Sequence, residues 1–399
     1  MKRWEGILIS TILFAACKKP YNPPAIVAPG LYLVVEGVIN AGADSTIIKL
    51  SHTVKLSSGS TLNPVFNAIV TVESDQNFVF PLAETTSGNY VSADLNLDNS
   101  HKYRLSIKIN NEQYYSDFEP VLNSPPIDSL YYTIATNGIN IYTNTHDPAN
   151  TVKYYRWDYL EIWMIHPMYY SGFISNGDTV LLRALSQQVF LCSPADVSST
   201  LILGSTAALV KDVIYNKPIT SIPSTSDKIG NEYSILVRQY ALTAGAYTFW
   251  SNLKTNTEQL GSIFDAEPSQ INGNIHSSTN PAEQVVGYIS VGSVSSQRIF
   301  IRNQQLPGWQ QDNPYADCAL DTEYYVYYYK GDNYPINQVD QTINYNSNDF
   351  VKNRINPLIP IGPISGQPGQ PPIGYSASTR LCADCTLQGT NVQPGYWKY

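Results

Sequence analysis

The chain has 399 residues, a formal net charge of −8 and 14% charged residues, and 30 of its positions are tyrosine. It has no basic stripe that could neutralise phosphates, so its composition argues against nucleic-acid binding. The abundance of tyrosine together with Asn, Ser and Thr favours strands with polar, uncharged surfaces. The length predicts two or three domains.

Residues 1–16 have the features of a secretory signal peptide. Lys2 and Arg3 precede an uncharged run at 7–16, which is too short for a membrane span of roughly 20 apolar residues. Two alanines come directly before Cys17, as in the cleavage site of a bacterial lipoprotein. We therefore expect Cys17 to be acylated and to anchor the mature chain. The alternative is an ordinary signal peptide followed by an incidental cysteine.

The next part of the chain predicts a linker and then a β-sandwich. Residues 17–30 are rich in proline and are typical of a tether between the lipid anchor and the folded part. Short β-rich runs separated by Gly, Asn, Asp and Ser fill residues 31–124, which predicts an immunoglobulin-like or fibronectin-like sandwich. Within it, 102–110 alternates apolar and polar residues, as a half-buried strand does. Asn110 and Asn111 then predict a tight hairpin turn.

A second, larger β-rich domain is expected from residue 125 to residue 399. Prolines at 125 and 126 mark the boundary, and further strand patterns follow. A helix is predicted near 244–260, with Thr243 as its N-cap. Its apolar stripe consists of Ala246, Phe249, Trp250, Leu253 and Leu260. On this stripe Trp250 is either a core residue or a binding aromatic.

The chain ends in a Pro/Gly-rich tail at 357–399, whose first part, 357–372, is predicted to be a long surface loop. Aromatic residues occupy the last positions, where most chains fray. Because leaving large rings in water is unfavourable, we expect the tail to fold back and Trp397 to pack against the second domain. The alternative is that Trp397 is an exposed contact for a partner.

Four cysteines remain after the predicted cleavage: Cys192, Cys318, Cys382 and Cys385. An even number in an exported chain predicts two disulfides, for which three pairings are open. The two cysteines at 382 and 385 could instead form a redox pair or half of a zinc site, although their Pro/Gly-rich surroundings do not resemble a thioredoxin-like βαβ unit.

The catalytic motifs that we sought are absent from the sequence. No two histidines are three to five residues apart, and there is no G-x-S-x-G elbow, phosphate-binding loop, dinucleotide fingerprint or calcium loop. We therefore expect no catalytic residues, no metal and no cofactor.

Aromatic side chains are the conspicuous feature of 323–329. On a strand, Tyr325, Tyr327 and Tyr329 would share one face, which makes them a candidate aromatic binding surface. The alternative is that these rings pack within the sheet, as tyrosines commonly do.

Several long segments resemble the domain of unknown function 4249 family. They are YYRWDYLEIWMI, NEYSILVRQYALTAGAYTFW, NLKTNTEQLGSIFDAEPSQINGNI, VVGYISVGSVSSQRIFI, CADCTLQGTNVQPGYW and the junction PPIDSLYY. Members of this family are lipoproteins of Bacteroidota, commonly found beside TonB-dependent, SusC-like outer-membrane receptors. The resemblance supplies no catalytic residues. It implies an outer-membrane location next to such a receptor, and it leaves open whether the chain faces the cell surface or the periplasm.

Together these observations predict a non-enzymatic outer-membrane lipoprotein, an accessory or substrate-binding partner of a TonB-dependent nutrient-uptake receptor whose ligand class is open. The alternative is a structural or adhesive cell-surface protein with no imported ligand. A third hypothesis, a hydrolase without known motifs, predicts a concave pocket in which acidic groups converge.

Overall fold

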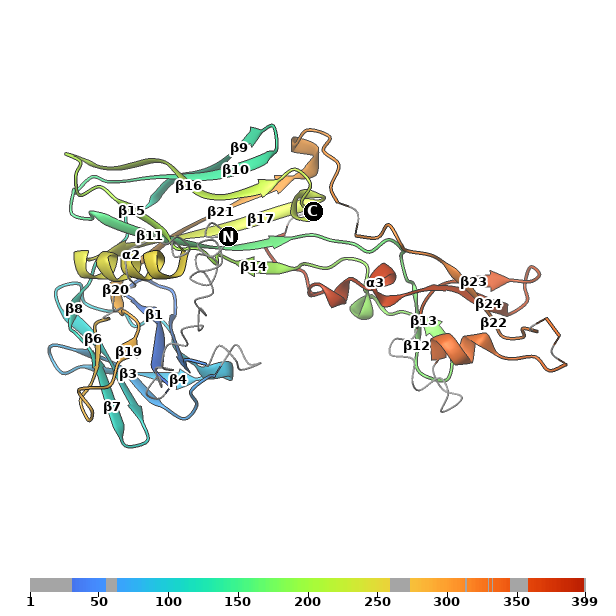
Figure 1. Ribbon diagram of the computed structural model, residues 1–399, viewed down its shortest axis with the longest axis horizontal. Helices are drawn as coiled ribbons and strands as arrows, with labels where there is room; N and C mark the ends of the chain where they lie inside the picture. The colour runs from blue at the N-terminus through green and yellow to red at the C-terminus, as the bar shows by residue number, and fades with distance from the viewer. Residues whose placement is uncertain are drawn as a thin grey trace, which may run out of the picture.

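Two packed β-sandwiches and a long, narrow arm make up the molecule (Figure 1). The computed structural model describes residues 31–54, 63–258, 273–312, 314–328, 330–331, 333–344 and 358–397. The predicted signal peptide, the tether and Cys17 lie outside these residues. The fold is mostly β, as predicted. In the part of the chain that is described, no helix combines the length and the apolar character that a membrane span requires.

The first sandwich forms around one apolar core. Its sheet has the strand order β18-β7-β6-β3-β4-β5-β2-β1-β19, with β20 pairing with β1 and β8 with β6. The alternating pattern predicted for 102–110 is β6, whose inward side chains Tyr103, Leu105 and Ile107 are buried. The elements from the N-terminal part are β1 (Leu33–Asn40), β2 (Thr46–His52), β3 (Ile69–Ser74), β4 (Val79–Glu84), a 3-10 turn η1 (Thr86–Gly88), β5 (Asn89–Ser92), β6 (Lys102–Ile109), β7 (Glu112–Ser116) and β8 (Glu119–Pro120).

Three strands of this sandwich come from much later in the chain: β18 (Ile275–Ser277), β19 (Val285–Val286) and β20 (Ser290–Gly292). β18 pairs with β7, and β19 and β20 pair in parallel with β1. The predicted boundaries, 31–124 and 125–399, are therefore wrong. All three lie far along the chain from their partners, and the parallel neighbours β19 and β20 require a long connection. The pattern within 31–124 could therefore not reveal these strands.

Asparagine makes the tight turns. The β6–β7 hairpin has Asn110 and Asn111 as its two-residue loop, between the paired Ile109 and Glu112, as predicted. Asn110 has a φ of 53°, and every other non-glycine residue of the described chain with a positive φ is also asparagine. A short polar side chain tolerates this left-handed conformation better than other side chains do.

The second sandwich has two facing sheets. One has the order β16-β10-β9, and the other has β14-β11-β17-β21 with β15 also paired to β11. Tyr155, Trp157 and Tyr233 are fully buried between them. The elements are β9 (Ile127–Ala135), β10 (Gly138–Asp147), β11 (Tyr154–Trp163), β14 (Ala195–Val197), β15 (Ile202–Ser205), β16 (Asp212–Pro223), η3 (Asp227–Ile229), β17 (Glu232–Leu242), β21 (Val294–Arg302) and η4 (Asn303–Gln305).

The predicted helix is α2 (Ala244–Glu258), which lies between the two sandwiches (Figure 1). Thr243 is its N-cap, because the Thr243 hydroxyl accepts a hydrogen bond from the Ala246 backbone N–H at 3.2 Å. Ala246 and Phe249 are buried, whereas Trp250 and Leu253 are only partly buried. Leu260, also predicted on the stripe, lies outside the described residues.

Candidate functional site

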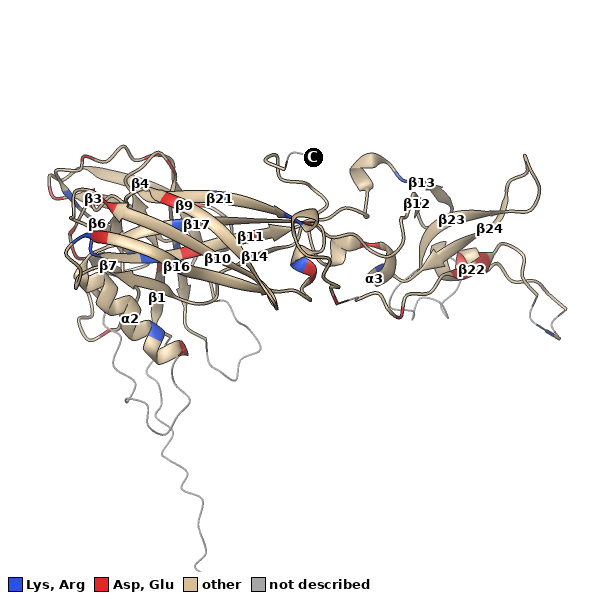
Figure 2. Cartoon of the chain, turned by 90° about the horizontal axis from the view of Figure 1, so that it is seen from above, with Lys and Arg blue, Asp and Glu red and all other residues tan. Residues whose placement is uncertain are grey.

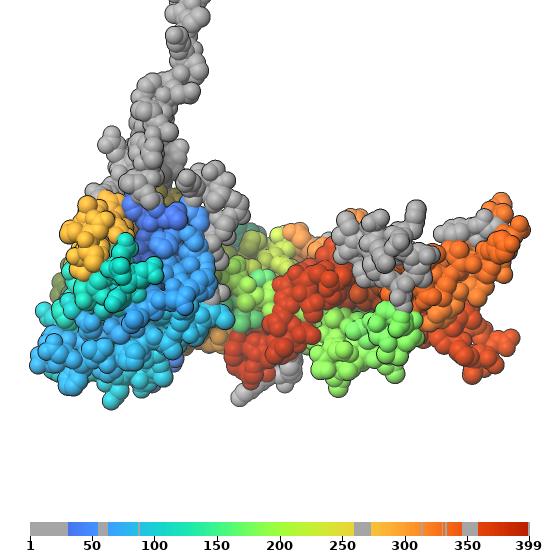
Figure 3. Space-filling view, turned by 90° about the horizontal axis from the view of Figure 1, so that it is seen from below, coloured from blue at the N-terminus to red at the C-terminus, as the bar shows by residue number. Residues whose placement is uncertain are grey.

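The arm extends from the second sandwich, away from the first (Figures 1 and 3). We define it as the described residues of 164–194 and 314–397. Its elements are β12 (Phe173–Ser175), β13 (Val180–Leu182), a 3-10 turn η2 (Leu185–Gln187), β22 (Asp321–Tyr324), a π-helical turn η5 (Asp340–Asn344), β23 (Ile359–Ser365), β24 (Pro372–Ser378), α3 (Arg380–Ala383) and a 3-10 turn η6 (Cys385–Leu387). The surface loop predicted at 357–372 is only partly right: 366–371 is an exposed loop, but it connects β23 and β24, which form a hairpin.

The apolar core of the arm is small. Its buried members are Val180, Val339, Ile343, Tyr375 and Ala377. A core of this size supplies little stability by itself, and small exported modules commonly depend on disulfides.

Both predicted disulfides are present, and both lie in the arm. Cys192 pairs with Cys385 and Cys318 with Cys382, each with a Cα–Cα distance of 5.7 Å. Neighbouring Cys382 and Cys385 thus bond to different partners and do not form a redox pair with each other. The bridges tie the C-terminal tail to two different segments, at sequence separations of 193 and 64 residues.

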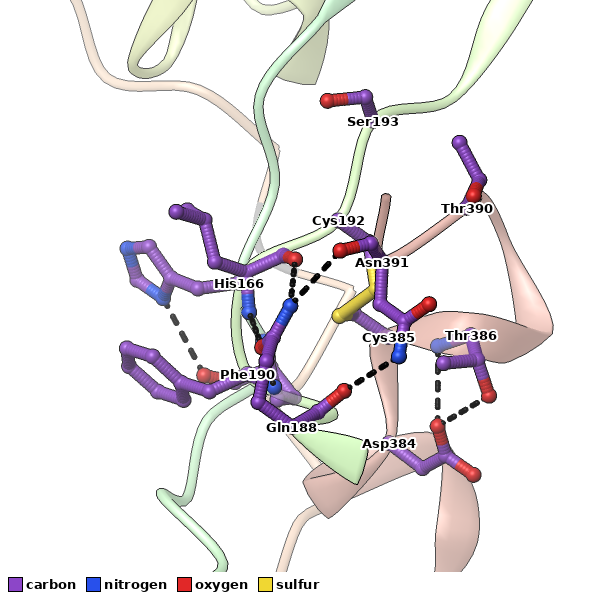
Figure 4. The surroundings of a disulfide bond; sticks show 12 residues. His166, Gln188, Phe190, Cys192, Ser193, Asp384, Cys385, Thr386, Thr390 and Asn391 are labelled. Carbon is purple, nitrogen blue, oxygen red and sulfur yellow. Dashed lines mark hydrogen bonds between the residues drawn. A yellow bond between two sulfur atoms is a disulfide. The ribbon is translucent and has the colours of Figure 1, made fainter. Parts of the chain in front are cut away.

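Hydrogen bonds reinforce the Cys192–Cys385 bridge (Figure 4). The Gln188 side-chain amide donates to the Asn391 carbonyl at 3.1 Å, and the Asn391 amide donates back to the Gln188 carbonyl at 2.7 Å. The Ser193 N–H donates to the Thr390 carbonyl at 2.8 Å. The tail is therefore attached along its length and not only at the sulfur atoms.

A buried carboxylate fixes the tail between the two disulfides. Asp384 accepts from the Arg380 guanidinium at 2.8 Å and from the Thr386 N–H at 2.9 Å. Burial acts to raise the pKa of Asp384, but the hydrogen bonds from Thr386 and Arg380 outweigh it, so the pKa lies below its ordinary value. Asp384 therefore remains charged and keeps the helical turns at 380–387 in place.

The end of the tail packs as predicted. Trp397 is 5% exposed and contacts Ile162 and Met164, and its ring meets that of Phe300 edge-on at 5.8 Å. Trp397 is thus a core residue at the base of the arm.

The candidate aromatic surface at 323–329 forms only in part. β22 ends at Tyr324, so the predicted continuous strand is wrong. Tyr325 packs edge-on against Tyr375 at 6.3 Å, and burial raises its pKa. Tyr327 is half-buried and stacks on Tyr324 at 6.5 Å, although a strand would place these two on opposite faces. Tyr329 lies outside the described residues.

The strand ends where the chain changes its pairing partner. The Tyr325 N–H still donates to the Ile373 carbonyl at 3.0 Å, but Tyr327 exchanges backbone hydrogen bonds with Ile336, at 3.0 and 2.8 Å, and not with β24. Tyr325 therefore belongs to the core of the arm, and Tyr327 presents only part of its ring.

The arm instead exposes many aliphatic side chains, which the sequence reasoning missed. Leu182 is 78% exposed and Leu185 is 93% exposed, and Leu181 beside them is also exposed. Further exposed apolar residues of the arm are Met168, Tyr170, Leu320, Val326, Tyr328, Tyr334, Ile373, Leu381, Leu387 and Val392. Most of the arm carries neither acidic nor basic residues (Figure 2). Clustered exposed apolar side chains mark interaction sites, and Leu181, Leu182 and Leu185 lie close together in the chain.

A signal for this surface existed in the sequence. VLLRAL at 180–185 is a short apolar run, but only Val180 of its large apolar residues is buried. Periodicity cannot separate a buried run from an exposed one when the segment is this short.

Among the described residues, no group of three or more His, Cys, Asp or Glu is placed to hold a metal ion.

Comparison with known proteins places the chain in a family. No curated protein matches it. Among solved structures it is similar to a two fibronectin type-III domain segment from chicken tenascin, with 11% identity over 53% of this chain and 93% of that chain, at a TM-score of 0.16. The model of a domain of unknown function (DUF4249) matches residues 18–298, so the segment CADCTLQGTNVQPGYW lies beyond the match. Because the match covers well over half of the chain, this protein belongs to the DUF4249 family.

Proposed function

We propose that this protein is a non-enzymatic lipoprotein of the outer membrane that docks through its arm onto a TonB-dependent receptor and assists nutrient uptake. The observation that carries the proposal is the exposure of Leu182 and Leu185 on a disulfide-linked arm that projects from two packed sandwiches.

The arm has the properties that a docking element needs. Burying one such leucine against a partner contributes roughly 1.5–3 kcal/mol. Two disulfides restrict the arm before binding, so less conformational entropy is lost on association. The lipid anchor predicted at Cys17 would confine the protein to the membrane in which such a receptor lies.

The test is recovery of the partner from membranes. A tagged chain purified from outer membranes should bring down a TonB-dependent receptor, identified by mass spectrometry. The double variant Leu182→Asp/Leu185→Asp should recover at least about tenfold less receptor, because two charges would enter an apolar interface.

The chain offers a matched control. Leu209 and Val210 are also exposed, at 53% and 91%, but they lie on the second sandwich between β15 and β16. Leu209→Asp/Val210→Asp should recover as much receptor as the wild type does. Equal losses from both double variants, or no receptor with the wild type, would count against docking by the arm. If a deletion strain also grew normally on every nutrient tested, a structural or adhesive role would be favoured.

A further inference from the structure

A cleft of about 550 Å³ lies between the two sandwiches. One wall is formed by β1, β2 and the loop between them, and the other by the outer face of β11, β17 and β21. Side chains alternate along β11, so Tyr155 and Trp157 enter the core while Arg156 and Asp158 face the cleft. The volume is typical of small-molecule sites.

Two arginines line the cleft, and only one of them has a carboxylate partner among the described residues. Arg238 lies opposite Asp158 in the strand register, and its Nε donates to the Asp158 carboxylate at 2.6 Å. Arg156 lies opposite Tyr240 and has no carboxylate partner among the described residues; its Nε is buried without a hydrogen bond. The charge of Arg238 is therefore neutralised by Asp158, whereas the charge of Arg156 has no carboxylate partner in the described part of the chain.

Aromatic rings hold the unpaired guanidinium in place. The Arg156 guanidinium carbon lies 4.4 Å from the ring centre of Tyr240 and 4.5 Å from that of Trp250 on α2. Burial, followed by the charge of Asp158, raises the pKa of Tyr240, so its phenol stays neutral at ordinary pH. Cation–π contacts position a guanidinium but leave its N–H groups free to bind oxygen atoms.

The rest of the lining indicates the class of ligand. A guanidinium fork matches the two oxygens of a carboxylate. Val38, Ile47, Leu236 and Val294 supply apolar surface to the same cleft. Asp44 also lines it and disfavours ligands of high negative charge. We propose that this cleft binds a small organic carboxylate, with the carboxylate on Arg156 and the hydrocarbon part on the apolar wall.

Carboxylate binding by the cleft is separate from docking by the arm and can be tested without a receptor. Isothermal titration of the purified protein with benzoate, 3-phenylpropionate and hexanoate should detect binding of at least one of them. Benzamide, which has the shape of benzoate without its charge, should not bind. Arg156→Gln should weaken carboxylate binding by roughly tenfold to a hundredfold.

Arg104 provides the matched control. Its guanidinium also lies over two rings, those of Tyr115 at 4.2 Å and Phe118 at 4.8 Å, but it is paired with Glu73 at 2.7 Å. Arg104→Gln should leave carboxylate binding unchanged. If Arg156→Gln does not fold, Arg156→Lys retains the charge without the fork and should bind severalfold more weakly than the wild type.

Three results would overturn the proposal. The first is that none of the three carboxylates shows binding at concentrations up to about 10 mM. A dissociation constant above that value is too weak for a useful site. The second is that Arg156→Gln and Arg104→Gln bind equally well. The third is that inorganic phosphate binds as tightly as the carboxylates do, because the site would then be a general oxyanion site. Each leaves receptor docking by the arm unaffected, so the two proposals fail separately.

Discussion

Removing the Cys192–Cys385 bridge tests how the arm is stabilised. The perturbation is the double variant Cys192→Ala/Cys385→Ala. The bridge closes a loop of 193 residues, which includes most of the second sandwich. In the chain-entropy model such a loop contributes about 5 kcal/mol at 25 °C by restricting the unfolded chain. We therefore expect the free energy of unfolding of this part of the protein to fall by several kcal/mol.

Urea unfolding followed by tryptophan fluorescence measures this loss, and limited proteolysis shows where it acts. Trp397 reports on the tail directly, because it is buried at the base of the arm. New cleavages at 379–397 should appear under native conditions, since the tail would then be held only by hydrogen bonds and apolar contacts.

The Cys318–Cys382 disulfide allows the stabilising effects of the two bridges to be compared. The Cys318–Cys382 loop has 64 residues, for which the same model gives about 4 kcal/mol, so its double alanine variant should be slightly less destabilised. Cys318 is half-buried whereas Cys192 and Cys385 are buried, so limited reduction and alkylation should label Cys318 and Cys382 first. Unfolding free energies within about 1 kcal/mol of wild type for both variants, with no new cleavage, would refute the stabilising role.

Three further predictions concern the anchor, the core and acid stability. Cys17→Ala should move the protein from membrane to soluble fractions, and undiminished membrane retention would contradict the lipoprotein prediction. Gln239→Leu should lower the free energy of unfolding in urea by about 2–3 kcal/mol, because it leaves the buried Trp157 indole N–H without its 2.9 Å acceptor. Burial raises the pKa of Asp147, but hydrogen bonds from the Val152 and Thr151 N–H groups outweigh it and lower the pKa below 3.8. The stability that the charged Asp147 carboxylate contributes is present above the pKa of the unfolded state and should be lost progressively as the pH falls from that pKa through the lower pKa of the folded state. Asp147→Asn should therefore flatten the acidic part of the pH profile of thermal stability.

Local patterns of the sequence were sufficient for much of the fold. The alternation at 102–110, the Asn110 turn and the Thr243 cap each depend on interactions within a few residues, and the structure confirms all three. The strands β18, β19 and β20 depend on partners far away along the chain. No local pattern could assign them to the first sandwich, because their partners β1 and β7 are separated from them in the chain by the strands of the second sandwich.

The candidate sites were less predictable, for a different reason. The tyrosine run at 323–329 has the composition of a strand, but β22 ends at Tyr324 and Tyr327 pairs with Ile336, a partner that the local pattern does not reveal. The exposure of Leu182 and Leu185 depends on the small size of the arm's core, which is a tertiary property. Likewise, Arg156 and Arg104 each lie over two aromatic rings, but of the two only Arg104 has a carboxylate partner among the described residues, Glu73, which comes from another strand.

The cleft and the arm share β11, which raises the question of whether they act together. Arg156 lies in the first half of this strand, and Ile162, which contacts Trp397 at the base of the arm, lies near its end. Six residues along a strand separate them by roughly 20 Å, and substitutions so far apart usually act additively. We therefore expect Arg156→Gln to leave receptor recovery unchanged.

The converse should hold as well. Leu182→Asp/Leu185→Asp should leave carboxylate binding unchanged in the titration, because the arm contributes no residue to the cleft. If either variant altered the other property by more than about fivefold, a coupling free energy of roughly 1 kcal/mol would connect the two sites. β11 and β21 would then be the elements to examine, since side chains of both strands line the cleft and contact the tail at Trp397. Additive behaviour would instead establish two independent surfaces on one sheet.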